Sequence, residues 1–258
     1  MASWLEWFGF TADPFVTRPL QSEEEFNDFF VKTSSIEKEF AAFIDQVRVS
    51  PFIRLVVGKR GMGKSTVLQY AIHLCRKWDI LAAYVGLYPY GIKRSKEPVF
   101  EIARQLMHTT IQELICSLFE FKNVLFSKNK SVLIKWANYV GLSFDEIEGF
   151  IRDPTFKLDF EMLKNIIFGF LDFVKHHQIP ILVAIDNLDK LDIDIVKVFL
   201  KGAASQPLFE KFNACGASVL IAADPKLAQE TEKDPDLSFL RQKIQLEPLS
   251  PTEAEDLI

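Results

Sequence analysis

The chain has 258 residues, of which 48% are hydrophobic and 25% are charged, and its formal net charge is -5. An apolar fraction of this size can bury a core that offsets the entropy of ordering, so the composition excludes a disordered chain. The mildly acidic balance gives the protein as a whole no electrostatic footprint for nucleic acid, although a local basic loop is compatible with it.

The sequence shows no targeting or membrane signal. Its start, MASWLEWFGF, lacks the positive region and the long apolar stretch of a signal peptide. No uninterrupted apolar run reaches the roughly 18 residues that a membrane-spanning helix needs. Three cysteines, Cys75, Cys116 and Cys215, are far apart and fit no metal or redox spacing. We therefore expect a soluble, cytoplasmic protein without a membrane partner.

The first half of the chain alternates strand and helix patterns. An N-terminal segment and helix, residues 1–50, are expected to lead into a core domain at 51–248. Strands are predicted at 54–57 and 80–87, and each is followed by a helical pattern, from Lys64 onward and at 98–119. Between the second strand and its helix we expect a basic loop that contains Lys93, Arg94 and Lys96.

The second half continues the alternation after a less regular stretch. Residues 120–158 contain short helical patterns and are interpreted as a helical insertion. A helix around 163–174 precedes continuous apolar runs at 181–185 and 218–223 and a shorter strand at 243–246. Strands that alternate with helices imply a parallel sheet covered on both faces.

A phosphate-binding loop stands between the first strand and its helix. The sequence GKRGMGKS, from Gly58 to Ser65, matches G-x-x-x-x-G-K-[ST] at every fixed position. Glycines let backbone N–H groups turn toward phosphate oxygens, and the helix N-terminus adds the positive end of a dipole. We expect Lys64 to reach the β- and γ-phosphates and Ser65 to ligate Mg²⁺. The candidate nucleotide-binding residues are Gly58, Lys59, Arg60, Gly61, Met62, Gly63, Lys64, Ser65 and Thr66.

A carboxylate for the metal follows the apolar run at 181–185. Asp186 ends this run, and we expect it to hold Mg²⁺ through Ser65 and water. About 120 residues and the strand at 80–87 separate Lys64 from Asp186, which favours an additional-strand ATPase with the metal strand beyond an inserted one. The absence of an N-K-x-D guanine motif disfavours a GTPase. A small-molecule kinase is the minority alternative.

With these motifs, the chain resembles the AAA+ ATPases, especially the branch of replication initiators of the origin-recognition type. The resemblance implies a P-loop NTPase fold, α/β, with three α/β/α layers, a central parallel five-stranded sheet and the helical insertion. It also implies ATP or ADP and Mg²⁺ as cofactors and association into a homo-oligomer. Residues 249–258 resemble the start of the family's first lid helix, so we expect the lid to be largely absent from this sequence.

The resemblance assigns further residues, each with an alternative. Phe30, Val31 and Ile36 fall in a segment that contacts adenine in the family, although a helix packed on the sheet explains them equally. Asp224 or Ala223 would sense the γ-phosphate after the strand at 218–223, or Asp224 would cap the next helix. Arg241 corresponds to an arginine that reaches a neighbouring subunit's nucleotide. The alternative for Arg241 is a solvated surface side chain.

The sequence departs from the family after the metal carboxylate. Many AAA+ proteins have a Glu base there, whereas this chain has Asn187, whose amide cannot accept a proton. Asp189 is the nearest substitute, and Asp-x-x-Asp also occurs in signalling ATPases of the KAP and STAND types. The candidate catalytic residues are Lys64, Asp186, Asp189 and Arg241.

We therefore expect an ATPase that hydrolyses ATP slowly and acts as an oligomerising, nucleotide-controlled switch. Its partner is either DNA or a protein. A signalling or defence switch and a nucleotide-binding scaffold without turnover are the alternatives.

Overall fold

The computed structural model describes residues 24–26, 34–120, 136, 138, 143, 160–202 and 206–248. Its centre is a five-stranded sheet in the order β2-β3-β4-β1-β5, and every pairing is parallel. The strands are β1 (Ile53–Val57), β2 (Leu81–Gly86), β3 (Ile181–Asp186), β4 (Ala217–Ala223) and β5 (Gln242–Gln245). The predicted α/β fold with a parallel five-stranded sheet is confirmed.

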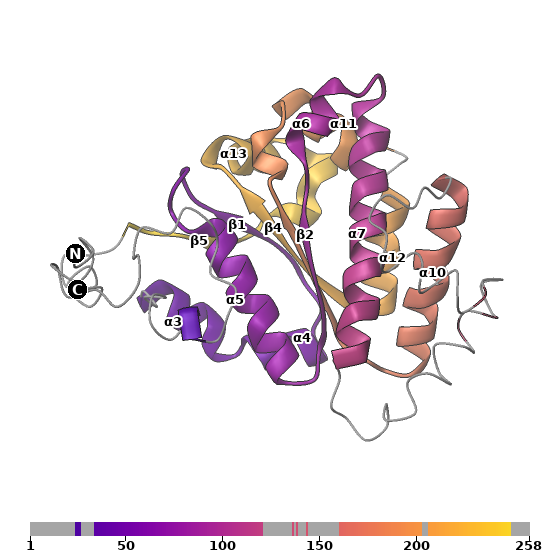
Figure 1. Ribbon diagram of the computed structural model, residues 1–258. Helices are drawn as coiled ribbons and strands as arrows, with labels where there is room; N and C mark the ends of the chain where they lie inside the picture. Colours follow the sequence, from indigo (N-terminus) through magenta and orange to yellow (C-terminus); the bar gives the residue numbers. More distant parts are fainter. Residues whose placement is uncertain are drawn as a thin grey trace, which may run out of the picture.

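Helices cover both faces of this sheet and make three layers (Figure 1). One face packs against α3 (Ser34–Ala41), α4 (Phe43–Val49) and α5 (Lys64–Lys77). The other face packs against α7 (Pro98–Glu120), α10 (Phe160–His176), α11 (Ile193–Lys201), α12 (Gln206–Cys215) and α13 (Pro225–Lys233). Two short 3₁₀ helices, η2 (Leu188–Lys190) and η3 (Pro235–Leu240), complete this second layer.

The central strands β3 and β4 are almost entirely apolar because both faces of the sheet are covered. Successive side chains of a strand point to opposite faces, so in β4 Leu220 and Ala222 join the α5 side of the core. Val219 and Ile221 join the α7 side. Every residue of β3 and β4 is buried, which explains why these segments read as continuous apolar runs.

Two expectations for the first half need correction. The inserted strand is β4, which pairs with both β1 and β3, while the strand predicted at 80–87 is β2 at the edge of the sheet. The expected basic loop contains a helix, α6 (Pro89–Arg94), so Lys93 and Arg94 are helical. Pro89 occupies its first turn, where proline is well tolerated.

Some predicted features lie outside the described residues. They are Phe30, Val31, the lid segment 249–258 and nearly all of the insertion at 120–158. Among the helices that are described, none combines the length and apolarity needed to cross a bilayer.

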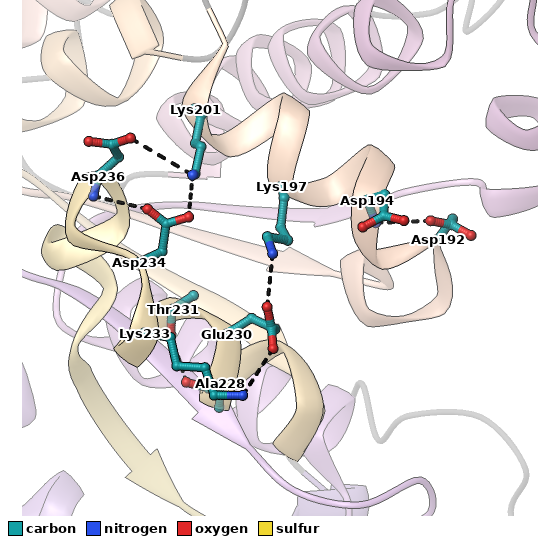
Figure 2. A network of polar contacts seen from close by, with 10 residues as sticks. All are labelled: Asp192, Asp194, Lys197, Lys201, Ala228, Glu230, Thr231, Lys233, Asp234 and Asp236. Atoms are coloured by element: carbon teal, nitrogen blue, oxygen red, sulfur yellow. Dashed lines mark hydrogen bonds and ion pairs between the residues drawn. The ribbon is translucent and has the colours of Figure 1, made fainter.

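A network of ion pairs joins α11 to α13 and η3 (Figure 2). Lys197 Nζ lies 2.8 Å from a Glu230 carboxylate oxygen, and Lys201 pairs with Asp234 and, at 3.8 Å, with Asp236. The hydrogen bond from Lys197 holds the pKa of Glu230 below its usual value, and the hydrogen bond from Lys201 does the same for Asp234. The network therefore connects the segments that follow β3 and β4.

Acid should weaken this network. Both carboxyl groups have a lower pKa in the folded protein than in the unfolded chain, where the values are 4.5 for Glu230 and 3.8 for Asp234. The ion pairs therefore stabilise the fold fully above these unfolded pKa values, and this stabilisation is lost as the pH falls through the lower, folded pKa values. We expect Glu230→Gln to lower the urea midpoint at pH 7 but to have little effect near the acid limit of folding. Glu247→Gln, at an exposed site, is the control. An equal effect of Glu230→Gln at both pH values would contradict the expectation.

Candidate nucleotide-binding site

The predicted phosphate cradle is the loop between β1 and α5. Gly61 and Gly63 have φ values of +86° and +78°, and a Cβ atom on either would meet nothing within 4 Å. Only glycine adopts this conformation without strain, and the space beside both glycines is open. The first hydrogen bond of α5 runs from Val67 N to Gly63 O at 2.9 Å. The N–H groups of residues 64–66 therefore lack partners within the helix, as anion binding requires.

Lys64 is buried at the start of α5. Its Nζ atom donates to the carbonyl oxygens of Gly58 at 2.9 Å and Lys59 at 3.2 Å. The same atom lies 3.0 Å from Asp189 Oδ2, and the two side chains are only 10% and 8% exposed. The cradle lysine and the Asp189 carboxylate, both predicted as catalytic, are thus brought into direct contact.

Asp186 ends β3 with its carboxylate inside the protein. The residue is 3% exposed. Its Oδ1 accepts a hydrogen bond from the N–H of Asn187 at 2.7 Å, and its Oδ2 accepts one from the Tyr84 hydroxyl at 2.6 Å. A buried carboxylate held by two donors keeps lone pairs in reserve for a cation.

Tyr84 lies beside both predicted metal ligands, and sequence reasoning missed it. It lies on β2 opposite Ala184 of β3 and packs on the α5 side of the sheet. Ser65 and Gln69 of α5 are also neighbours of the Tyr84 side chain. Burial, and then the charge of Asp186, raise the pKa of Tyr84 far above its usual range, so the hydroxyl stays a donor. A lone hydroxyl in an otherwise apolar strand was the available signal.

The residues at this point fit a magnesium ion that comes with its nucleotide. The described residues contain no group of three or more His, Cys, Asp or Glu side chains that could cage a metal. Magnesium in phosphate-transfer sites needs no such cage, because substrate phosphates and water supply most ligands. Asp186, which accepts a hydrogen bond from Tyr84, and Ser65, a neighbour of the same tyrosine, match that smaller requirement.

The residue after Asp186 has a structural task. Asn187 has a φ of 66°, and its Nδ2 donates to the carbonyl oxygen of Leu87 at 3.0 Å. This bond fastens the end of β3 to the end of β2. Within the described part of the chain, Asn187 Oδ1 and Asp189 Oδ1 are buried and accept no hydrogen bond. Asp189 also lines a cavity of about 270 Å³.

The remaining predicted residues are Ile36, Asp224 and Arg241, and of these Asp224 directly follows Ala223, whose carbonyl oxygen accepts a hydrogen bond from the cradle's Gly58 N–H at 3.2 Å. Ile36 is 6% exposed in α3 and packs in the core cluster with Phe43, so packing on the sheet is observed and adenine contact stays a prediction. Asp224 accepts a hydrogen bond from Leu227 N at 2.7 Å, which confirms the capping alternative.

Arg241 is exposed and immediately precedes β5. Gln242 of β5 pairs with Arg54 near the start of β1, whereas the cradle follows the end of β1. Arg241 therefore lies at the amino end of the parallel strands, whereas the cradle of its own chain lies at their carboxyl end. A role at a neighbouring subunit's nucleotide stays a prediction.

Comparisons with known proteins give limited similarity. No protein-family model matches the sequence, and no curated protein matches it. Among solved structures, the chain is similar to Cdc6p from Pyrobaculum aerophilum, with a TM-score of 0.42 and 13% sequence identity. The similarity covers 95% of this chain and 50% of that protein, so this chain spans about half of the other's length.

Proposed function

We propose that the protein binds ATP with Mg²⁺ in the cradle at residues 58–66 and hydrolyses it slowly, as a nucleotide-controlled switch of the AAA+ type. The observation that supports this most is the buried Asp186 carboxylate, held by the Tyr84 hydroxyl, with Ser65 beside that tyrosine and an open phosphate loop before α5. The additional strand β4 between β1 and β3 agrees with an additional-strand ATPase. The same arrangement gives no support to a GTPase.

Each part of the cradle has a distinct task in binding. The N–H groups at the start of α5 would donate to phosphate oxygens, and the helix dipole favours their charge. Lys64 would exchange the Asp189 carboxylate for phosphate oxygens, since one ammonium cannot serve both fully. A bound Mg²⁺ supplies charge neutralisation at the phosphates, and Asp186 and Ser65 are the residues that would hold it.

Slow hydrolysis follows from what Asn187 and Asp189 do in the free protein. Asn187 cannot act as a base, and its amide holds the end of β2. Asp189 is the carboxylate next to the cradle, but Lys64 occupies one of its oxygens. Once Lys64 turns to the phosphates, Asp189 would be free to orient and deprotonate water in the cavity that it lines. We infer that the release of Asp189 from Lys64 limits the rate of hydrolysis.

A second candidate is a nucleotide-binding scaffold without turnover. The observation that favours it is again Asn187, because the position that normally carries the base serves a structural hydrogen bond instead. The two candidates share the cradle and differ only in phosphate release. An assay of inorganic phosphate from ATP therefore separates them: slow release supports the switch, and none supports the scaffold.

Calorimetry on the full chain tests the shared part. We expect ATP to bind, and Mg²⁺ to tighten binding by about tenfold or more, equivalent to about 1.4 kcal/mol. Asp186→Asn should abolish the effect of Mg²⁺ while leaving most of the metal-free binding, because the cradle itself is unchanged. Asp194→Asn, at an exposed site on α11, is the matched control. If no nucleotide binds to the folded protein, the proposal is wrong.

A further inference from the structure

The carboxylate of Asp186 is held at both of its oxygens. Oδ1 accepts the N–H of Asn187 at 2.7 Å, and Oδ2 accepts the Tyr84 hydroxyl at 2.6 Å. The first donor belongs to the next residue, whereas the second comes from another strand, 102 positions away in the sequence. We propose that Tyr84 is a positioning residue that makes the nucleotide site select Mg²⁺ over the larger Ca²⁺. This role rests on the proposed function, since it concerns the same metal site.

The main chain beside Asp186 is held as well. The N–H of Leu87 donates to the carbonyl oxygen of Asp186 at 3.2 Å. Asn187 Nδ2 donates in turn to the carbonyl oxygen of Leu87 at 3.0 Å. These two hydrogen bonds join the ends of β2 and β3 independently of the Tyr84 contact. A shift of the backbone that carries the Asp186 side chain would break them, so the position of this carboxylate is fixed from its base.

The pairing of β2 with β3 brings the Tyr84 hydroxyl to Asp186. Tyr84 lies opposite Ala184, and Gly86 lies opposite Asp186. Side chains two positions apart on a strand share a face, so Tyr84 and Asp186 both point to the α5 side of the sheet. A Cβ atom on Gly86 would lie 3.4 Å from Tyr84 Cε1, so the ring lies against this glycine. The residue opposite Asp186 therefore has no side chain between the ring and the carboxylate.

Two fixed donors limit how this carboxylate can bind a cation. Asp186 is 3% exposed, so water has little access to replace either donor. For both oxygens to face one cation, the carboxylate must turn, and the turn would lengthen or break the hydrogen bond from Asn187 or from Tyr84. While Tyr84 donates, we expect Asp186 to offer a single oxygen, either to the cation or to a water that the cation carries.

Coordination through one oxygen separates the two cations. Ca²⁺ takes about six to eight oxygen ligands, and it often binds a carboxylate through both oxygens. Mg²⁺ demands nearly ideal octahedral geometry, keeps several waters and needs only one or two carboxylates beside the phosphates. A carboxylate that cannot turn suits Mg²⁺ and deprives Ca²⁺ of a ligand, whereas a carboxylate that turns freely would serve both. The Tyr84 hydroxyl is the side-chain group that decides between these two cases.

Calorimetry of ATP binding to the full chain tests the proposal, without metal, with Mg²⁺ and with Ca²⁺. In the wild-type protein, Mg²⁺ should tighten binding about tenfold more than Ca²⁺ does, because loss of a well-placed carboxylate ligand or of its support costs about 10-fold to 100-fold in metal affinity. Tyr84→Phe removes only the hydroxyl and should abolish most of this difference between the cations. The affinity for ATP without metal should stay unchanged, because the cradle is intact.

Tyr88→Phe is the matched control. Tyr88 follows β2 at the same end of the sheet and is 60% exposed, so the same loss of a hydroxyl should leave all three affinities unchanged. The EPR spectrum of Mn²⁺ bound with ATP gives a second readout, and it should broaden in Tyr84→Phe because the carboxylate then takes more than one position. Circular dichroism verifies folding. The wild-type comparison of Mg²⁺ with Ca²⁺ tests the proposal even if Tyr84→Phe does not fold.

Three results would overturn the proposal. They are equal tightening by Mg²⁺ and Ca²⁺ in the wild-type protein, an unchanged difference between the cations in folded Tyr84→Phe, and an equal loss of affinity with and without metal in that variant. The last result would show a merely structural role. Each of them, obtained while wild-type protein binds ATP and responds to Mg²⁺, leaves the proposed function standing. If the wild-type protein binds no ATP or does not respond to Mg²⁺, the proposed function fails and the role of Tyr84 fails with it.

Discussion

Replacing Lys64 with alanine is expected to reduce the affinity for ATP by about 100-fold or more. Lys64 is the buried cation of the cradle, and its loss removes charge-assisted hydrogen bonds to phosphate, worth about 1.5–3 kcal/mol each. Phosphate release should become undetectable with it. Calorimetry with Mg²⁺ and ATP and an assay of inorganic phosphate give the two measurements.

The control for this variant must separate binding from folding. Lys64→Ala leaves the Asp189 carboxylate buried without its cation, which is itself destabilising. The double variant Lys64→Ala, Asp189→Ala removes both charges, so it should recover stability without recovering ATP binding. Lys77→Ala, at the exposed end of the same helix, should bind normally. Normal ATP affinity in a folded Lys64→Ala protein would refute the assignment of the cradle.

Replacing Asp189 with asparagine is expected to move binding and turnover in opposite directions. In the free protein Asp189 competes with phosphate for Lys64, at a distance of 3.0 Å. Removal of its charge should therefore tighten ATP binding by about threefold to tenfold, equivalent to about 0.7–1.4 kcal/mol. Hydrolysis should fall by about 100-fold if Asp189 is the base, as general-base catalysis contributes at least that much.

A neighbouring carboxylate supplies the control. Asp192 lines the same cavity but caps α11, where its Oδ1 accepts from Asp194 N at 2.9 Å. Asp192→Asn preserves an effective cap and should change neither measurement. A brisk ATPase rate that Lys64→Ala abolishes and Asp189→Asn leaves intact would show that Asp189 is not the base. Weaker ATP binding in Asp189→Asn would exclude the competition for Lys64.

The central strands β3 and β4 were predictable because they are buried on both faces. Segments such as Ile181–Asp186 and Ala217–Ala223 are continuous apolar runs, which periodicity detects directly. The order of the strands was harder to predict. The place of β4 between β1 and β3 depends on contacts across the whole chain, which local pattern does not encode. A six-residue helix such as α6 is likewise too short for a periodic signal.

In the candidate site, too, local sequence patterns were predictable and long-range contacts were not. The cradle residues are contiguous and carry a motif, so Gly61, Gly63 and Lys64 were identifiable from sequence, and the structure shows a loop that fits. The contacts of Tyr84 with Asp186 and of Lys64 with Asp189 join residues far apart in sequence, through the pairing of β2 with β3 and the packing of α5 on the sheet. Contacts of this kind depend on the fold, so they could not be predicted from the local sequence.

The position of β1 has a consequence for how the protein acquires its activity during synthesis. β1 is flanked by β4 and β5, the last two strands of the sheet, with Ile53 opposite Val219 and Arg54 opposite Gln242. Such distant pairings close large loops and form slowly. The strand that supports the cradle therefore gains both neighbours only after the end of β5 has left the ribosome. A nascent chain that stops before β4 would present the whole GKRGMGKS motif and still have no sheet on which to hold it.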